Sequence, residues 1–140
     1  MVGKDPPADI KSLGENQLIT ITGTVDDIRP FIWRSAVAVV PLIYGAGIQN
    51  KILEAMATGT PVVTTSKALT SLEVRPNIDI LVGDTAEDFS MKVLDLVGNP
   101  ALQRSIGNEG LNYVQRNHHW KTIVFQLADI YMQVTGARNS

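Results

Sequence analysis

Apolar residues in this chain follow two periods, one typical of buried strands and one typical of a helix. Ala36–Val40 is a continuous apolar run, as expected for a strand that is buried on both faces. The next apolar positions recur at helical spacing, at Ile48, Ile52, Leu53 and Met56. This pattern predicts a helix that starts near Ile48 and packs one side on a sheet. Gly59 ends the helix, Pro61 prevents it from resuming, and Val62–Thr65 is the next predicted strand.

The remaining helices are predicted from capping signals and apolar stripes. Asp26 or Asp27 caps a helix with Pro30 in its first turn. Thr85 is followed three residues later by an acidic residue, which is the spacing of a capping box, and Asn99-Pro100 is typical of a further helix start. The last predicted helix carries a stripe of Trp120, Val124, Leu127, Ala128 and Tyr131. We expect these side chains to form core and not a binding site.

Gly45-Ala46-Gly47 separates the Ala36–Val40 strand from its helix. Two glycines allow positive φ angles and a close approach of the backbone to a ligand. The first helical amides, at Ile48, Gln49 and Asn50, lack carbonyl partners within the helix, so together with the helix dipole they predict an anion site. A tight turn that binds no ligand explains the glycines equally well. The dinucleotide fingerprint needs a third glycine where this chain has Asn50, which disfavours NAD.

Glu54 lies in the second turn of the same predicted helix, and two roles are open to its carboxylate. It can form an i,i+3 ion pair with Lys51, worth about 0.2–0.5 kcal/mol. It can instead accept hydrogen bonds from the hydroxyl groups of a sugar. The helix dipole gives an acidic residue little help at this depth, and physical chemistry alone slightly favours the ion pair.

Composition indicates one soluble domain spanning residues 1–140, because 140 residues with 44% hydrophobic and 19% charged side chains support one core. The net charge of −2 gives no reason to expect nucleic acid as a partner. The chain has no cysteine, no apolar run long enough to span a membrane and no secretory signal. The cytoplasm is the expected compartment, with a peripheral position at the inner membrane face as the alternative. His118 and His119 lack acidic partners at metal-ligand spacing, so we expect no metal.

The segment Gly45–Val63, GAGIQNKILEAMATGTPVV, resembles the signature of the retaining GT-B glycosyltransferases called family 4 or group 1. Their motif is Glu-x7-Glu with the ending E-A-M-A-x-G-x-P-V-V, and Glu54–Val63 matches this ending at every fixed position. The resemblance implies that Glu54 binds the ribose hydroxyls of a nucleotide-sugar donor such as a UDP-, GDP- or ADP-hexose. It implies no further cofactor. The diphosphate would be held by Gly45, Gly47, Ile48, Gln49, Asn50 and Lys51.

The first glutamate of the family motif falls on Ala46, a departure that affects recognition of the donor sugar. The resemblance extends over nearly the whole chain. Leu18–Ile28 is similar to the family's strand and turn before the next helix, and Asp79–Val82 is similar to its last short strand. In the family the nucleotide base packs at the end of the first of these strands. The base-proximal residues implied here are Gly23, Thr24 and Val25.

The resemblance implies a Rossmann-like α/β domain of three layers, with a parallel sheet of about four to five strands. The chain matches only the C-terminal, donor-binding half of a GT-B enzyme, and it lacks that half's first strand. We therefore expect the acceptor domain to belong to another part of the same protein, and this chain alone to be inactive. We also expect unpaired strand edges at Val37–Pro41 and around Val2, through which two copies of the chain form a homodimer.

The full enzyme would transfer a hexosyl group to a glycan, a lipid or a small molecule. Two other classes of function stay open. One is a GT-B-like epimerase or phosphorylase, and the other is a non-catalytic nucleotide-binding or assembly module, which Ala46 makes more credible.

Overall fold

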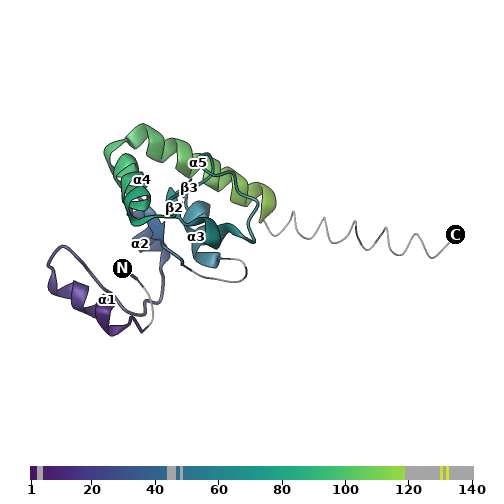
Figure 1. The fold of residues 1–140 in the computed structure, drawn as a ribbon. Helices are drawn as coiled ribbons and strands as arrows, with labels where there is room; N and C mark the ends of the chain where they lie inside the picture. The colour runs from purple at the N-terminus through teal and green to yellow at the C-terminus, as the bar shows by residue number, and fades with distance from the viewer. Residues whose placement is uncertain (3–4, 44–46, 48, 119–129, 131, 133–140) are drawn as a thin grey trace. The chain divides into compact units, whose positions relative to one another are not determined.

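The computed structural model of the chain describes residues 1–2, 5–43, 47, 49–118, 130 and 132 (Figure 1). The chain divides into two compact units, Met1–Ser35 and Ala36–Ser140. Among the described residues, no helix is long and apolar enough to cross a membrane. The predicted helix that carries Trp120, Val124, Leu127, Ala128 and Tyr131 falls outside the described residues, as does His119.

The first unit contains three short helical segments, α1 (Ala8–Ser12), η1 (Leu13–Glu15) and α2 (Arg29–Trp33). The strand expected within Leu18–Ile28 does not form, which corrects the prediction. Met1 donates its amino group to the carbonyl of Thr20 and accepts from the amide of Thr22, so the pairing amounts to one residue. A strand needs a continuous ladder, and Leu18 at its predicted start is 92% exposed.

Asp27 organises the start of α2, as one of the two predicted capping residues. Its carboxylate accepts a hydrogen bond from the backbone amide of Arg29 at 2.9 Å and two more from the Arg29 guanidinium, from Nε and Nη2, each also at 2.9 Å. The side-chain hydrogen bond from Arg29 is the main reason that the pKa of Asp27 lies below its ordinary value. Pro30 stands in the first turn, where the missing amide hydrogen costs nothing.

The second unit is built on three parallel strands, β1 (Ala38–Val40), β2 (Val62–Thr64) and β3 (Leu81–Val82), in the order β1-β2-β3. The helices α3 and α4 flank this sheet, and the α/β Rossmann-like fold is confirmed (Figure 1). The described residues form three strands where four to five were expected. The missing pairing in the first unit accounts for part of the difference, since a strand exists only through its neighbours.

Burial along β1 differs from the expectation that Ala36–Val40 is covered on both faces. Val40 is 5% exposed, but Val39 is 51% exposed and Ala36 is exposed as well. Among the described strands β1 lies at the edge of the sheet, whereas the central strand β2 buries Val62 and Val63 almost completely. The prediction was wrong because an apolar run does not reveal whether its strand is central or at an edge. Dimerisation through this edge stays a prediction.

The helices of the second unit are α3 (Asn50–Ala57), α4 (Ala86–Gly98) and α5 (Pro100–Asn117), with the short helix η2 (Ser66–Leu69) after β2. The predicted caps are confirmed: Thr85 Oγ1 accepts from the amide of Asp88 at 3.1 Å, and Asn99 Oδ1 accepts from the amides of Ala101 and Leu102. Gly59 ends α3 with a φ of +73°, the left-handed conformation that favours glycine. These local signals therefore set where each helix begins or ends.

One core joins the sheet to α4 and α5. It is formed by Val63, Leu81, Leu96 and Ile106, with Val37, Phe89, Val93 and Leu102 packed around it. On the side of α3, the helix buries Ile52, Ala55 and Met56. The helix α5 contacts both α3 and α4, so it holds the two flanking helices together.

Candidate functional site

The carboxyl ends of β1, β2 and β3 meet at one edge of the sheet because the strands are parallel. The segments that follow the strands are tied to one another there. Thr65 Oγ1 donates to the carbonyl of Leu42, and the amide of Ser66 donates to Asp84 Oδ1 at 2.8 Å. Ligands of open α/β sheets bind outside the carboxyl ends of the strands. This edge, which we call the carboxyl edge, is therefore the candidate site.

The N-terminus of α3 follows β1 at the carboxyl edge. The helix begins at Asn50, two residues later than predicted, and Gln49 precedes it with a non-helical φ of −87° and ψ of 87°. The first helical hydrogen bond in the described segment runs from the amide of Ile52 to the carbonyl of Gln49 at 2.9 Å. Within the described part of the chain, the amides of Asn50 and Lys51 have no acceptor. Exposed amides at a helix N-terminus attract anions.

Gly47 precedes this helix with a φ of +83°, a conformation that a residue with a side chain rarely adopts. The carbonyl of Gly47 accepts a hydrogen bond of 3.4 Å from Nε2 of Gln49. The turn therefore requires glycine at this position, which agrees with the expectation for the loop. The other predicted loop residues, Gly45, Ala46 and Ile48, lie outside the described residues.

Glu54 is exposed on α3, while the neighbouring positions Ile52 and Ala55 are buried. The ion pairs of the described residues join Arg29 to Asp27 and Arg75 to Asp79 and Glu109. The i,i+3 pair with Lys51, which was the alternative role of Glu54, is not among them. The Glu54 carboxylate is therefore available to a ligand that approaches the first turns of α3.

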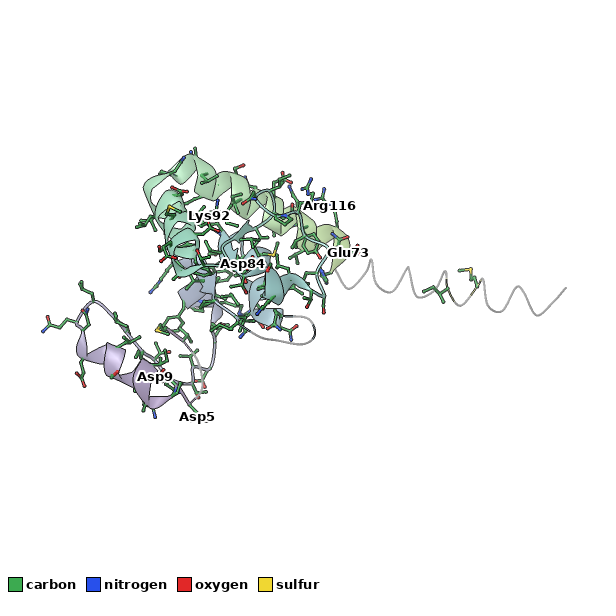
Figure 2. All side chains as sticks on the ribbon, in the orientation of Figure 1. Asp5, Asp9, Glu73, Asp84, Lys92 and Arg116 are labelled. Carbon is green, nitrogen blue, oxygen red and sulfur yellow. The ribbon has the colours of Figure 1, made fainter. Side chains whose placement is uncertain are left out.

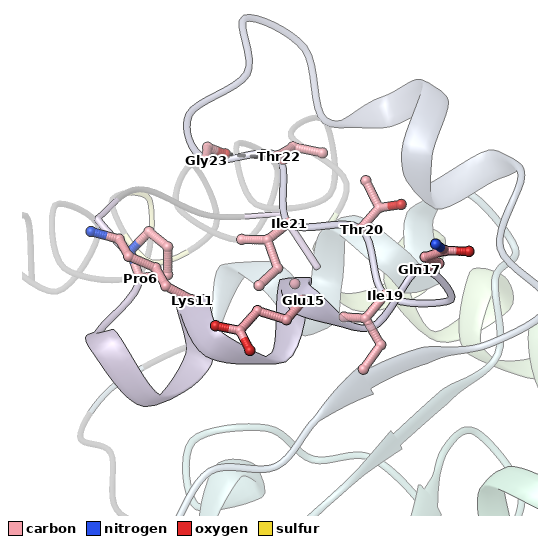
Figure 3. A pocket seen from close by; sticks show the side chains of 10 residues that line it. Pro6, Lys11, Glu15, Gln17, Ile19, Thr20, Ile21, Thr22 and Gly23 are labelled. Carbon is pink, nitrogen blue, oxygen red and sulfur yellow. Dashed lines mark hydrogen bonds between the residues drawn. The ribbon is translucent and has the colours of Figure 1, made fainter.

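The base-proximal residues Gly23, Thr24 and Val25 belong to the first unit. Gly23 has a φ of +68°, and its carbonyl accepts from Thr22 Oγ1 at 3.1 Å. Gly23 lines a hollow of about 700 Å³ in this unit, which Thr24 and Val25 do not line. Ile21 extends across this hollow toward the helical segment that carries Glu15 (Figure 3). The first unit thus offers an open, mixed polar and apolar surface beside Gly23.

A second hollow, of about 520 Å³, lies at the carboxyl edge of the second unit. Sequence reasoning did not assign its lining, which includes Pro41 after β1, Thr65 after β2, Asp84 after β3 and Phe89 on α4. Asp84 lies close to the start of α4 (Figure 2). The signal that would have found these residues is the parallel-strand rule, because each one follows or faces the end of a strand.

His118 lies at the end of α5, away from the carboxyl edge in sequence. Its Nε2 is 3.1 Å from the hydroxyl of Tyr113, and the two rings are 5.3 Å apart. This contact gives His118 a packing role at a helix end, as the sequence predicts. The described residues contain no cluster of histidine and acidic side chains that could hold a metal ion.

Three parallel strands, flanking helices and a ligand-ready carboxyl edge define a Rossmann-like α/β domain. A family model described as "Glycosyl transferases group 1" matches residues 1–99, so the chain belongs to the group 1 glycosyltransferases. No curated protein matches the chain. Nineteen solved chains do match.

Sucrose-phosphate synthase from Thermosynechococcus elongatus, a GT-B enzyme, is one of these similar structures, with a TM-score of 0.77 and 26% sequence identity. The match covers 97% of this chain and 38% of that chain. The chain therefore has the GT-B fold and spans less than half the length of this relative.

Proposed function

We propose that the chain is the nucleotide-sugar-binding part of a retaining glycosyltransferase. The full protein would transfer a hexosyl group to a glycan, a lipid or a small-molecule acceptor. Membership of the group 1 family supports a glycosyltransferase domain. The observation that carries the donor-binding proposal is the N-terminus of α3, where exposed amides without an acceptor in the described chain precede the exposed carboxylate of Glu54.

The two groups suit the two ends of a nucleoside diphosphate. The amides of Asn50 and Lys51 and the positive end of the helix dipole favour the diphosphate. Glu54 lies four residues after Asn50, about 6 Å along the helix axis, and would accept hydrogen bonds from the ribose hydroxyls. When the sugar leaves, negative charge grows on the diphosphate, and donors that are already oriented stabilise it. In this scheme the backbone amides, the dipole and the ammonium of Lys51 do the work without a cofactor.

One sequence observation favours a second candidate, a non-catalytic nucleotide-binding module. Ala46 stands where the family motif has its first glutamate, so a carboxylate near the donor sugar is missing from the motif. Both candidates bind the nucleotide, and they differ in turnover. Release of nucleoside diphosphate from a nucleotide-sugar by the full-length protein would separate them.

Thermal unfolding in the presence of UDP, GDP or ADP tests the donor site. A nucleotide at a hundred times its Kd is expected to raise the free energy of unfolding by about 2.7 kcal/mol. The Glu54→Ala variant should lose most of this stabilisation and keep its stability without ligand within about 0.5 kcal/mol, since Glu54 is exposed. Asp95→Ala, which removes an exposed carboxylate from α4, is the matched control and should respond as the wild type does.

Two outcomes would count against the proposal. If none of the three nucleotides stabilises the chain, the donor site is absent. If a nucleotide stabilises Glu54→Ala as much as the wild type, the ribose role of Glu54 is wrong.

A further inference from the structure

A diphosphate at the carboxyl edge needs positive charge nearby, and few basic residues of the second unit lie there. Arg75 precedes β3 at the opposite edge and is paired with Asp79 and Glu109. Lys92 lies two turns into α4 and Arg116 near the end of α5 (Figure 2). Among the described basic residues, Lys51 and Lys67 remain as the candidates, on the segments that follow β1 and β2.

We propose that Lys67 binds a phosphate group of the donor and that Asp84 positions it through the backbone of Ser66. The inference rests on the proposed function and adds the residue that supplies charge from the β2 side of the site. Lys67 is exposed and forms none of the ion pairs of the described residues. Its ammonium is therefore available to an anion.

The backbone on both sides of Lys67 is held in place. On one side, the Ser66 amide donates to Asp84 Oδ1 at 2.8 Å, and the Thr65 hydroxyl donates to the carbonyl of Leu42. On the other side, Ala68 is 2% exposed, and its amide donates to the carbonyl of Thr65 at 3.1 Å. Lys67 thus projects from a turn that is anchored to the segments after β1 and β3.

The position of Lys67 also matches the chemistry of a phosphate contact. The Thr65–Leu42 hydrogen bond joins the Lys67 turn to the β1 segment that continues toward α3, where the amides would hold the diphosphate. An ammonium on a flexible stem is a point charge and suits a single phosphate oxygen that approaches from solvent. Asp84 offsets part of the positive field, but one of its oxygens is already occupied by the Ser66 amide.

The test compares the Kd of a nucleoside diphosphate with that of the corresponding nucleoside, measured on the full chain by calorimetry. Lys67→Ala should weaken diphosphate binding about tenfold, as expected for the loss of one charge-assisted hydrogen bond, and leave nucleoside binding unchanged. Lys67→Arg should restore most of the affinity. The tenfold difference should shrink as salt is raised, because exposed charges are screened. Lys92→Ala is the matched control and should bind both ligands as the wild type does.

Asp84 variants separate positioning from charge. Asp84→Asn keeps an oxygen for the Ser66 amide and should retain or slightly raise diphosphate affinity, since it removes a negative charge. Asp84→Ala removes the acceptor and should weaken diphosphate binding, while nucleoside binding stays constant. Equal diphosphate affinity in Asp84→Ala and the wild type would overturn the positioning role.

The outcomes also distinguish this inference from the proposed function. If the wild-type chain binds no nucleotide, both are overturned. If it binds a diphosphate in a Glu54-dependent manner and Lys67→Ala binds equally well, only the role of Lys67 is overturned.

Discussion

The Gly107→Ala variant is expected to lose about 1–3 kcal/mol of unfolding free energy, the usual cost of inserting an atom into a packed contact. A Cβ at Gly107 would lie 2.2 Å from the carbonyl oxygen of Gly59 and 3.6 Å from Cδ of Pro61. The nearest atom belongs to the backbone, so no side-chain rotation relieves the clash. The Gly59 turn has little room to adjust, because its φ of +73° already requires glycine. The helix α5 must therefore move away from the turn.

Denaturant titration of the chain measures this effect. Gly98→Ala is the matched control, because Gly98 also lies in a helix of the second unit and a Cβ there meets no atom within 4 Å. The control should be neutral or slightly stabilising, since alanine favours a helix. Equal stability of the two variants would show that α5 does not need the close approach to Gly59.

The same contact links stability to the candidate site. The Gly59 turn ends α3, and the Cβ position of Gly110, one turn further along α5, is 3.4 Å from the side chain of Met56 on α3. A shift of α5 would therefore reach the helix that carries Glu54.

The Asp79→Ala variant is expected to lose about 3 kcal/mol, as is typical when one partner of a buried ion pair is removed. Asp79 is 2% exposed and accepts hydrogen bonds from Arg75: 2.8 Å from the backbone amide and 2.6 Å from Nη2. The Arg75 guanidinium also donates to Glu109 Oε2 at 2.9 Å, which fastens the turn before β3 to α5. The Arg75 side chain is 51% exposed, so water can solvate it in the variant and the loss stays at the low end for such pairs.

Asp79 also makes the stability depend on pH at the acidic end. Burial opposes ionisation, but hydrogen bonds from the side chain and backbone of Arg75, together with the charges of Arg75 and Arg116, outweigh it and hold the pKa of Asp79 below 3.8. A lowered pKa in the folded state stabilises the protein above the unfolded pKa, near 3.9, and this stability is lost as the pH falls through the folded pKa. Asp79→Ala should therefore lose less stability than the wild type between about pH 4 and pH 2.

Denaturant titrations at pH 7, 4, 3 and 2 measure both effects. The exposed carboxylate Asp95 again provides the control, since Asp95→Ala should follow the wild type across this range. Parallel pH curves for Asp79→Ala and the wild type would contradict the assigned role. Nucleotide binding should survive in Asp79→Ala at pH 7, because Asp79 precedes β3 and lies at the edge opposite the carboxyl edge.

Much of the local structure was predictable because its causes lie within a few residues. The caps formed by Thr85 and Asn99 and the glycine end of α3 each involve atoms at most four residues apart. The family resemblance of Gly45–Val63 was equally local, and the match to the group 1 family model confirms the class of protein it indicated. Loop geometry at Gly47 also agreed with the sequence, since a positive φ follows from the residue type.

The tertiary structure alone decided how these elements meet. The number of strands, the exposure of Val39 and the absence of a strand after Leu18 depend on which neighbours are present to pair. The hydrogen bond between Ser66 and Asp84 spans 18 residues, and the contact between Gly107 and Gly59 spans 48. No period or cap in the sequence encodes these separations, because the contacts arise only when parallel strands bring their ends to one edge and α5 packs across α3. The sequence by itself determined the class of protein and the ends of its helices, and the packing decided which residues join the site.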